Sequence, residues 1–289
     1  MLRVFFGQHK CASKWVALLI ERMCNELGWK STIAYRVRIN GHGGLRQLIE
    51  NEKPDFLIIP EADVDQVAEI PVPFKGFHIT RDPRDIVVSG YFSHLKVHAL
   101  VDDPALGVTM EHRKLLQRLP KKEGIDLEIA TIARVPLQHL HQWNYEDPRI
   151  LETTFTRLTS SSFEELAGIL AFLGMIKQQN RWTFGSRCYI NRLLKRFGMG
   201  GLRMRAESYA PAQLRKTLRD LSFENLRRGK PWWLNQRGAH YRKGRPGNWM
   251  EHMDPGQEAE IERLFPGLIA RAGESRQIAP PAMDLRSGQ

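Results

Sequence analysis

The segment 77–93 constrains the fold of this 289-residue chain more than any other, because a strand end, a turn and a helix start can all be read in it. An apolar run ends there at a charged turn, the pattern of a strand buried in a parallel sheet. In the helix that follows, Asp82 is predicted as the N-cap, Pro83 as the first helical residue and Asp85 as the capping-box residue.

Two side chains of this segment predict an anion site. Arg81 lies just before the helix, and Ser89 lies about two turns inside it. An arginine beside a helix N-terminus, with its free N–H groups and positive dipole end, favours a bound phosphate. A well-capped helix with a solvated Arg81 explains the same residues, so both interpretations stay open.

Composition and charge narrow the class of partner. With 42% hydrophobic and 26% charged residues the chain is typical of a globular protein, and we expect one domain over residues 1–272 with a flexible C-terminal tail at 273–289. The net charge of +11 indicates an anionic partner: a nucleotide, an acidic acceptor, nucleic acid or a membrane surface.

The cysteines and the N-terminus predict the compartment. Cys11, Cys24 and Cys188 are scattered and lack metal-ligand spacing, which favours a reducing environment without disulfides and gives no reason to expect zinc. The N-terminal apolar run is too short for a signal peptide, and no stretch approaches 18 uninterrupted apolar residues. These patterns predict a cytoplasmic protein.

Strands and helices are expected to alternate along the first part of the chain. Apolar runs predict strands at 2–6, 32–38, 55–60, 74–80 and 149–155, and helical periodicity predicts helices at 15–27, 45–50, 111–119, 126–140 and 162–173. This alternation predicts an α/β fold with a central parallel sheet flanked by helices.

Two further loops carry positive charge. Between the first strand and helix, Lys10 and Ser13 lie where backbone N–H groups and an ammonium converge, although the loop lacks the Gly-Lys-Ser/Thr order of a Walker A motif. The loop 240–249 contains three cations and two glycines ahead of a tryptophan. An ordinary turn with a solvated Lys10, and a charged surface loop, are the simpler explanations.

Together the three segments resemble the sulfotransferase family, which uses 3′-phosphoadenosine 5′-phosphosulfate (PAPS) as sulfuryl donor. Residues 10–15, Lys-Cys-Ala-Ser-Lys-Trp, are similar to the family's 5′-phosphosulfate loop, usually Lys-Ser-Gly-Thr-Thr-Trp, and Arg81 with Ser89 is similar to its 3′-phosphate motif. Residues 242–249 are similar to its late Arg-Lys-Gly loop and the Gly-Asp-Trp continuation. The resemblance spans residues 2–255 and implies a P-loop NTPase-like sulfotransferase fold.

The resemblance also implies a role for each matching residue. Lys10 would be catalytic, neutralising charge on the leaving phosphate oxygen. The cofactor-binding residues would be Lys10, Cys11, Ala12, Ser13, Lys14, Trp15, Arg81, Ser89, Phe155, Phe223, Arg242, Lys243 and Gly244. No metal is expected among them.

Several residues depart from the family pattern. Ala12 and Lys14 replace a glycine and a threonine, and Phe155 begins Phe-Thr-Arg-Leu where many relatives have Tyr-Glu-Asp-Leu, so an adenine contact is expected to differ. The family's catalytic histidine is missing after the third strand. A partly buried carboxylate with a raised pKa could replace it, with Glu61 as first candidate and Asp63 as second; His9 is another option.

The acceptor is not identified by the sequence. A hydroxyl or amine of a lipid, glycan or small molecule is expected, and the helical face of Ile190, Leu193, Leu194 and Phe197 with cations beside it predicts either contact with an anionic membrane or core packing. A basic nucleotide- or nucleic-acid-binding protein with weak or lost catalysis is the alternative, although no specific nucleic-acid module is recognisable. A P-loop kinase lacks support because Lys10 precedes the turn. The oligomeric state stays open.

Overall fold

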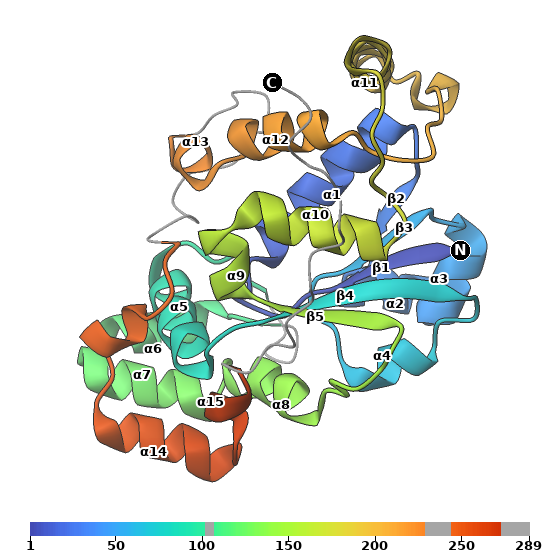
Figure 1. The fold of residues 1–289 in the computed structure, drawn as a ribbon. Coiled ribbons are helices and arrows are strands. Elements are labelled where there is room, and N and C mark those ends of the chain that lie inside the picture. The colour runs from blue at the N-terminus through green and yellow to red at the C-terminus, as the bar shows by residue number, and fades with distance from the viewer. Residues whose placement is uncertain (102–106, 229–243, 273–289) are drawn as a thin grey trace.

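A five-stranded, all-parallel sheet with strand order β2-β3-β1-β4-β5 forms the centre of the molecule (Figure 1). The structure is a computed structural model that describes residues 1–101, 107–228 and 244–272. The strands are β1 Leu2–Phe6, β2 Ser31–Ile33, β3 Phe56–Ile59, β4 Phe74–Thr80 and β5 Ile150–Thr154. The predicted α/β class, with a parallel sheet flanked by helices, is confirmed.

Helices cover both faces of this sheet because its strands are apolar on both sides. The helices are α1 Ser13–Leu27, α2 Arg36–His42, α3 Leu45–Glu52, α4 Val64–Ala68, α5 Pro83–Lys96, α6 Met110–Arg118, α7 Lys121–Ala130, α8 Arg134–Gln142, α9 Phe155–Ser160, α10 Ser162–Phe172, α11 Arg181–Arg196, α12 Pro211–Asp220, α13 Phe223–Arg227, α14 Pro255–Leu264 and α15 Leu268–Arg271. Among the described residues there are also two short 3₁₀ helices, η2 Gly200–Leu202 and η5 Asn248–Glu251.

Successive residues of β1 enter two different cores. Phe5 packs into the cluster that contains the buried faces of α1, α10 and α12, whereas Val4 and Phe6 pack into the cluster with α3. This is the two-residue period of a strand. The carboxyl ends of β1, β3 and β4 therefore open onto one edge of the sheet, where the turns that follow them meet.

Two predicted elements are wrong in extent. The strand predicted at 32–38 ends at Ile33, because β2 pairs only with β3, and β3 ends before Pro60, which has no N–H to donate. The helix predicted at 126–140 is divided into α7 and α8. Pro136 lies in the first turn of α8, where a missing N–H costs nothing, and it could not continue an unbroken helix. The strands predicted at 2–6 and 74–80 are confirmed.

Candidate functional site

The turn between β1 and α1 has a strained backbone. Lys10 and Ala12 have φ angles of 64° and 65°, in the left-handed region that L-residues with a Cβ rarely adopt. A non-glycine residue in this region costs about 1 kcal/mol or more and persists only where its surroundings require it. Ala12 occupies the position at which the 5′-phosphosulfate loop of the sequence pattern usually has glycine. The positive φ explains that preference, because glycine adopts such an angle without a Cβ clash.

The N-terminus of α1 is open. No side chain caps it among the described residues, and the Ser13 hydroxyl instead donates backwards to the Gln8 carbonyl over 2.7 Å. The first intrahelical bond runs from Val16 N to Ala12 O at 3.0 Å, which leaves the amides of residues 13–15 without intrahelical partners. Such amides, at the positive end of the helix dipole, bind anions readily.

Arg81 connects this turn to the end of β4. Its Nη1 donates to the Lys10 carbonyl over 2.8 Å, and its guanidinium lies over the Phe155 ring, 4.1 Å from the centroid. Burial lowers the pKa of Arg81, while Asp85 opposes that shift. Its Nε is buried without an acceptor among the described residues. Arg81 is therefore a buried cation whose Nε–H can still donate a hydrogen bond to a ligand. The simpler interpretation, in which Arg81 is solvated, is wrong.

The start of α5 agrees with the prediction at two positions and differs at one. Asp82 caps the helix by accepting from the amide of Arg84 over 2.9 Å, and Pro83 is the first helical residue. Asp85 does not complete a capping box. Its buried carboxylate accepts from the amides of Gly247 and Trp249 at 2.8 and 3.0 Å, because the late loop folds back onto the first turn of α5.

The same late loop reaches the helix that begins at Phe223. Gly244 has a φ of 61°, and a Cβ on it would lie 2.6 Å from the Phe223 ring, so only glycine fits this approach. Trp15 Nε1 donates to the carbonyl of Leu221 over 2.8 Å, which brings α1 to the same segment. The three loops singled out from the sequence thus converge. Arg242 and Lys243 lie outside the described residues, as does the predicted tail at 273–289.

The remaining loop residues differ in what their side chains can offer. Cys11 is fully buried, and burial raises the pKa of its thiol to about 12, so its side chain stays neutral and away from the surface. Lys14 is exposed, and Ser89 is half-buried on α5.

The two candidate carboxylates after β3 have different environments. The Glu61 carboxylate is more than half exposed and lies 3.4 Å from His9 Nδ1, and hydrogen bonding from His9 lowers the pKa of Glu61. The prediction that the pKa of this carboxylate is raised is therefore wrong for Glu61. Asp63 is the N-cap of α4 and exchanges two hydrogen bonds with Gln66 in a capping box, so its side chain is already engaged.

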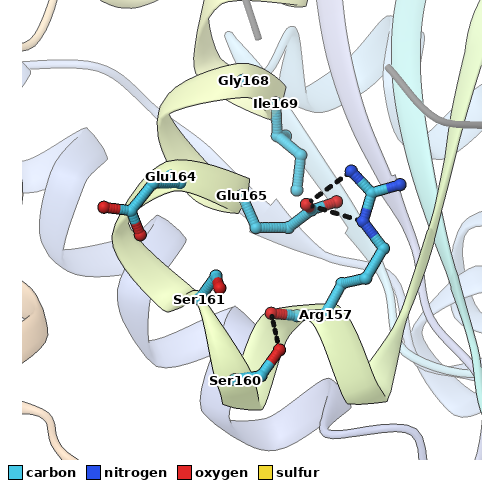
Figure 2. Close-up of a pocket in the computed structure, with 7 residues that line it drawn as sticks. All are labelled: Arg157, Ser160, Ser161, Glu164, Glu165, Gly168 and Ile169. Carbon is cyan, nitrogen blue, oxygen red and sulfur yellow. Dashed lines mark hydrogen bonds and ion pairs between the residues drawn. The ribbon is translucent and has the colours of Figure 1, made fainter. Parts of the chain in front are cut away.

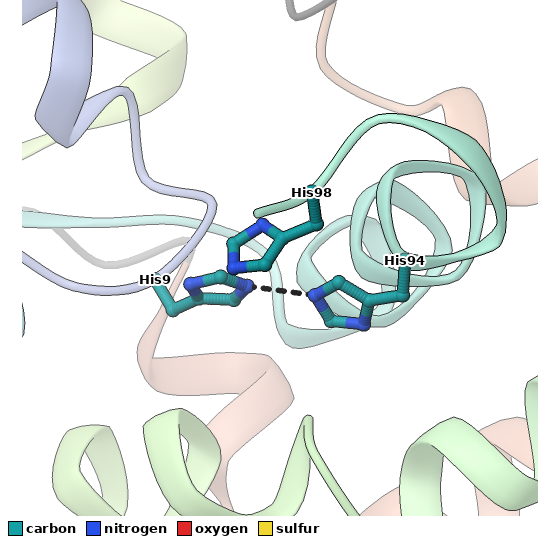
Figure 3. A group of neighbouring side chains, drawn as sticks. All are labelled: His9, His94 and His98. Carbon is teal, nitrogen blue, oxygen red and sulfur yellow. Dashed lines mark hydrogen bonds between the residues drawn. The ribbon is translucent and has the colours of Figure 1, made fainter. Parts of the chain in front are cut away.

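Sequence reasoning missed a group of imidazoles beside the same turn. Figure 3 shows His9, from the β1–α1 turn, facing His94 in the last turn of α5 and His98 just beyond it. His94 and His98 are four residues apart, a spacing that places two imidazoles on one helical face and was the available signal. His9 could be added only by the fold.

A separate depression lies between α9 and α10. It is lined by Arg157, Ser160, Ser161, Glu164, Glu165, Gly168 and Ile169 (Figure 2). Arg157 Nη2 and Glu165 Oε2 are paired at 2.9 Å, so these charges satisfy each other. None of the converging loops contributes to it, and it has no place in the site described above.

An open helix N-terminus, a buried arginine and a returning glycine loop thus lie together at one edge of a parallel α/β sheet, an arrangement that is suited to an anion. A family model described as the sulfotransferase domain matches residues 73–273, more than half of the chain. The chain therefore belongs to the sulfotransferase family, and the resemblance found in the sequence is confirmed.

One solved structure agrees with this assignment at the level of the fold. The chain is similar to mouse sulfotransferase SULT7A1 complexed with PAP, with a TM-score of 0.57 and 17% identity over 93% of this chain and 83% of that one. A second match, retinol dehydratase in complex with androsterone and the inactive cofactor PAP, has 14% identity over 97% and 83% of the two chains and a TM-score of 0.46. No curated protein matches the sequence. Within the described residues, no helix has the length and apolar character needed to cross a membrane.

Proposed function

We propose that this protein transfers a sulfuryl group from PAPS to a hydroxyl or amine of an acceptor. The observation that carries the proposal is Arg81, which donates to the Lys10 carbonyl and keeps a buried, unpartnered Nε. One arginine thereby joins the two loops expected to bind the two phosphate ends of an adenosine bisphosphate. The PAP complex of the similar mouse sulfotransferase SULT7A1 supports the same donor.

The turn after β1 would bind the 5′ end of the donor. The amides of Ala12, Ser13 and Lys14, with the backbone of Cys11, would hold the 5′-phosphate, and the Lys10 ammonium would neutralise charge on the leaving oxygen.

The other loops would bind the 3′-phosphate and the base. Arg81 and Ser89 approach from α5, and Arg242, Lys243 and Gly244 would approach from the late loop, which Asp85 anchors to that helix. Trp15 and Phe223 would pack near the adenine, since both adjoin the segment at Leu221. Phe155 would act through Arg81, whose guanidinium covers its ring.

The chemistry then requires little from the protein beyond placed charge. Sulfuryl transfer is in line and loose by analogy with phosphoryl transfer, so fixed cations and positioning provide the rate enhancement. The acceptor proton is assigned to Glu61, an ionised and accessible carboxylate at the carboxyl end of β3. A Glu61→Gln variant with unchanged kcat would contradict that role, whereas loss of kcat at unchanged donor affinity would support it.

A peripheral contact with an anionic membrane is part of the proposal. Helix α11 packs in the core through Phe184 and Cys188, yet Trp182, Tyr189 and Phe197 are exposed on it at intervals of seven and eight residues, along one stripe. Lys195 and Arg196 end the helix, and an apolar stripe beside cations suits a helix lying on anionic lipid.

Vesicle binding tests this contact. We expect the protein to sediment with phosphatidylserine-containing vesicles at low salt but not with phosphatidylcholine alone, and Phe197→Ser to weaken the binding. Val37→Ser, at an exposed valine of α2, is the matched control. Equal sedimentation of both variants and the unaltered protein would remove α11 from the contact.

The proposed activity is tested with labelled PAPS. The protein is incubated with ³⁵S-PAPS and an extract of its source, and the labelled product is identified, while PAP affinity is measured in parallel by calorimetry. Transfer of label together with PAP binding supports the proposal. Tight PAP binding without transfer would favour the alternative, a nucleotide-binding protein without catalysis, and binding of mixed oligonucleotides without PAP binding would reject both.

A further inference from the structure

Three imidazoles meet beside the β1–α1 turn. Ring nitrogens of His9, His94 and His98 all lie within 4.8 Å of one another, and the Nε2 atoms of His9 and His94 are 3.1 Å apart (Figure 3). His94 is fully buried, and the other two are half-buried. Nothing in the proposed sulfuryl transfer uses this group.

The carboxylate behind His94 fixes its tautomer. His94 Nδ1 lies 2.9 Å from both oxygens of Glu128, which is fully buried. Glu128 also contacts His112 Nε2 at 3.1 Å, and a carboxylate between two imidazoles accepts a hydrogen bond from each of them. The His94 proton therefore lies on Nδ1, and Nε2 presents a lone pair.

His9 has the same arrangement on the opposite side. Its Nδ1 faces the Glu61 carboxylate at 3.4 Å, so Nδ1–H points to that oxygen and Nε2 again presents a lone pair. Two lone pairs facing each other at 3.1 Å repel unless a cation lies between them. With these two tautomers, a positive charge between the rings, either a shared proton or a metal ion, stabilises the contact.

We propose that His9, His94 and His98 form a binding site for Zn²⁺ or a similar divalent transition metal. Two nitrogens each about 2.05 Å from a tetrahedral zinc are about 3.3 Å apart, close to the observed 3.1 Å. A ring nitrogen of His98 also lies within 4.8 Å of those of His9 and His94, and a proton shared between two rings does not need this third nitrogen. Carboxylates behind the imidazoles, as here Glu61 and Glu128, are the usual outer partners of zinc-bound histidine.

The neighbouring groups agree with this assignment. The neutral imidazole is the form that binds metal, and the full burial of His94 favours it. A second group of possible ligands consists of His94, His112 and Glu128. Its members already bond one another directly at 2.9 and 3.1 Å, which leaves no room for an ion between them. Three histidines leave a fourth coordination position open to water or another oxygen ligand.

Cobalt titration of the full chain, purified without a histidine tag and stripped with a chelator, tests the site. We expect one Co²⁺ per chain with visible d–d absorption of a low-symmetry site, displaced by Zn²⁺. His98→Ala, which removes a half-buried ring with no hydrogen bond among the described residues, should weaken binding by about 100-fold or more. His42→Ala, a half-buried histidine of α2, is the matched control.

The outcomes distinguish a bound metal ion from a proton shared between His9 and His94. Absence of bound cobalt in the unaltered protein, or equal affinity in His98→Ala and His42→Ala, would overturn the proposal and leave a shared proton between His9 and His94. Circular dichroism of His98→Ala shows whether it is folded, and His94→Gln gives a second variant without the ligand. Because no donor or acceptor is present, the result is independent of the proposed sulfuryl transfer.

Discussion

At the scale of single residues, the turn after β1 concentrates unusual features in a few positions. Lys10 and Ala12 are both left-handed, and the Lys10 carbonyl accepts from Arg81. The hydrogen bond from Arg81 to the Lys10 carbonyl helps to hold this strained backbone in place. The turn therefore has a defined backbone conformation in which the first amides of α1 point outward from the helix end.

Lys10→Ala is expected to lower the rate of sulfuryl transfer by about 10²- to 10³-fold, the range for removing one charge-stabilising donor. PAP affinity should change much less, because the amides of the turn remain. Steady-state kinetics with PAPS and the identified acceptor measure the rate. Lys53→Ala, at another left-handed lysine remote from the site, should leave it unchanged. An equal rate for the two variants would exclude the proposed role of Lys10.

Ala12→Gly is expected to raise the free energy of unfolding by about 1 kcal/mol, because glycine adopts a φ of 65° without the Cβ clash. Urea denaturation measures it. Ala17→Gly, at a helical position of α1, should act in the opposite direction. Destabilisation by Ala12→Gly would show that the turn is not strained at this residue.

At the scale of elements, Asp85 connects two segments more than 160 positions apart. Its carboxylate accepts from the amides of Gly247 and Trp249, and the Arg84 guanidinium stacks on the Trp249 ring at 3.6 Å. The loop that precedes η5 is thereby attached to the first turn of α5. Its placement depends on one buried carboxylate.

Asp85→Ala is expected to lower the free energy of unfolding by about 2 to 3 kcal/mol, since it leaves two amides unpaired. It should also weaken PAP binding by releasing the late loop. Asn180→Ala, which removes the side-chain cap of α11 far from the late loop, should cost about 1 kcal/mol and serves as the control. Chemical denaturation and calorimetry with PAP measure both effects. Equal losses for the two variants would mean that the late loop is held elsewhere.

At the scale of the whole molecule, ion pairs link distant parts of a strongly basic chain. Asp55, just before β3, pairs with Arg205 and accepts from the amide of Lys30 at 2.8 Å. Burial raises the pKa of Asp55, but the bonds from Arg205 and Lys30 lower it overall. A carboxyl whose pKa falls on folding stabilises the fold above its unfolded pKa and loses that effect as the pH falls through the folded value.

Asp55→Asn is therefore expected to lower the free energy of unfolding by up to about 1 kcal/mol at pH 7, since Arg205 is largely exposed. The difference from the unaltered protein should shrink as the pH falls below about 4, the ordinary range of an aspartate. Urea denaturation at pH 7, 5 and 3.5 measures it. A difference that stays constant with pH would show that the charge of Asp55 is not the source of its effect.

The sequence by itself determined the local features of this protein. Asp82 and Pro83 begin α5 as predicted, and the strands 2–6 and 74–80 have the predicted bounds, because caps and apolar periods depend on residues at most a few positions apart. The order of the motifs also predicted the sulfotransferase family. The extents of β2 and α8 were mispredicted where pairing partners and a proline decided them.

Only the tertiary structure decided which of these side chains meet. Asp85 was predicted as part of a cap and instead anchors a distant loop, Arg81 was compatible with solvent and instead packs on Phe155, and His9 joined His94 and His98. In each case the partner lies 70 or more positions away, so no local pattern contains it. Burial then makes these contacts decisive, because a charge or lone pair removed from water must find its counterpart within the fold.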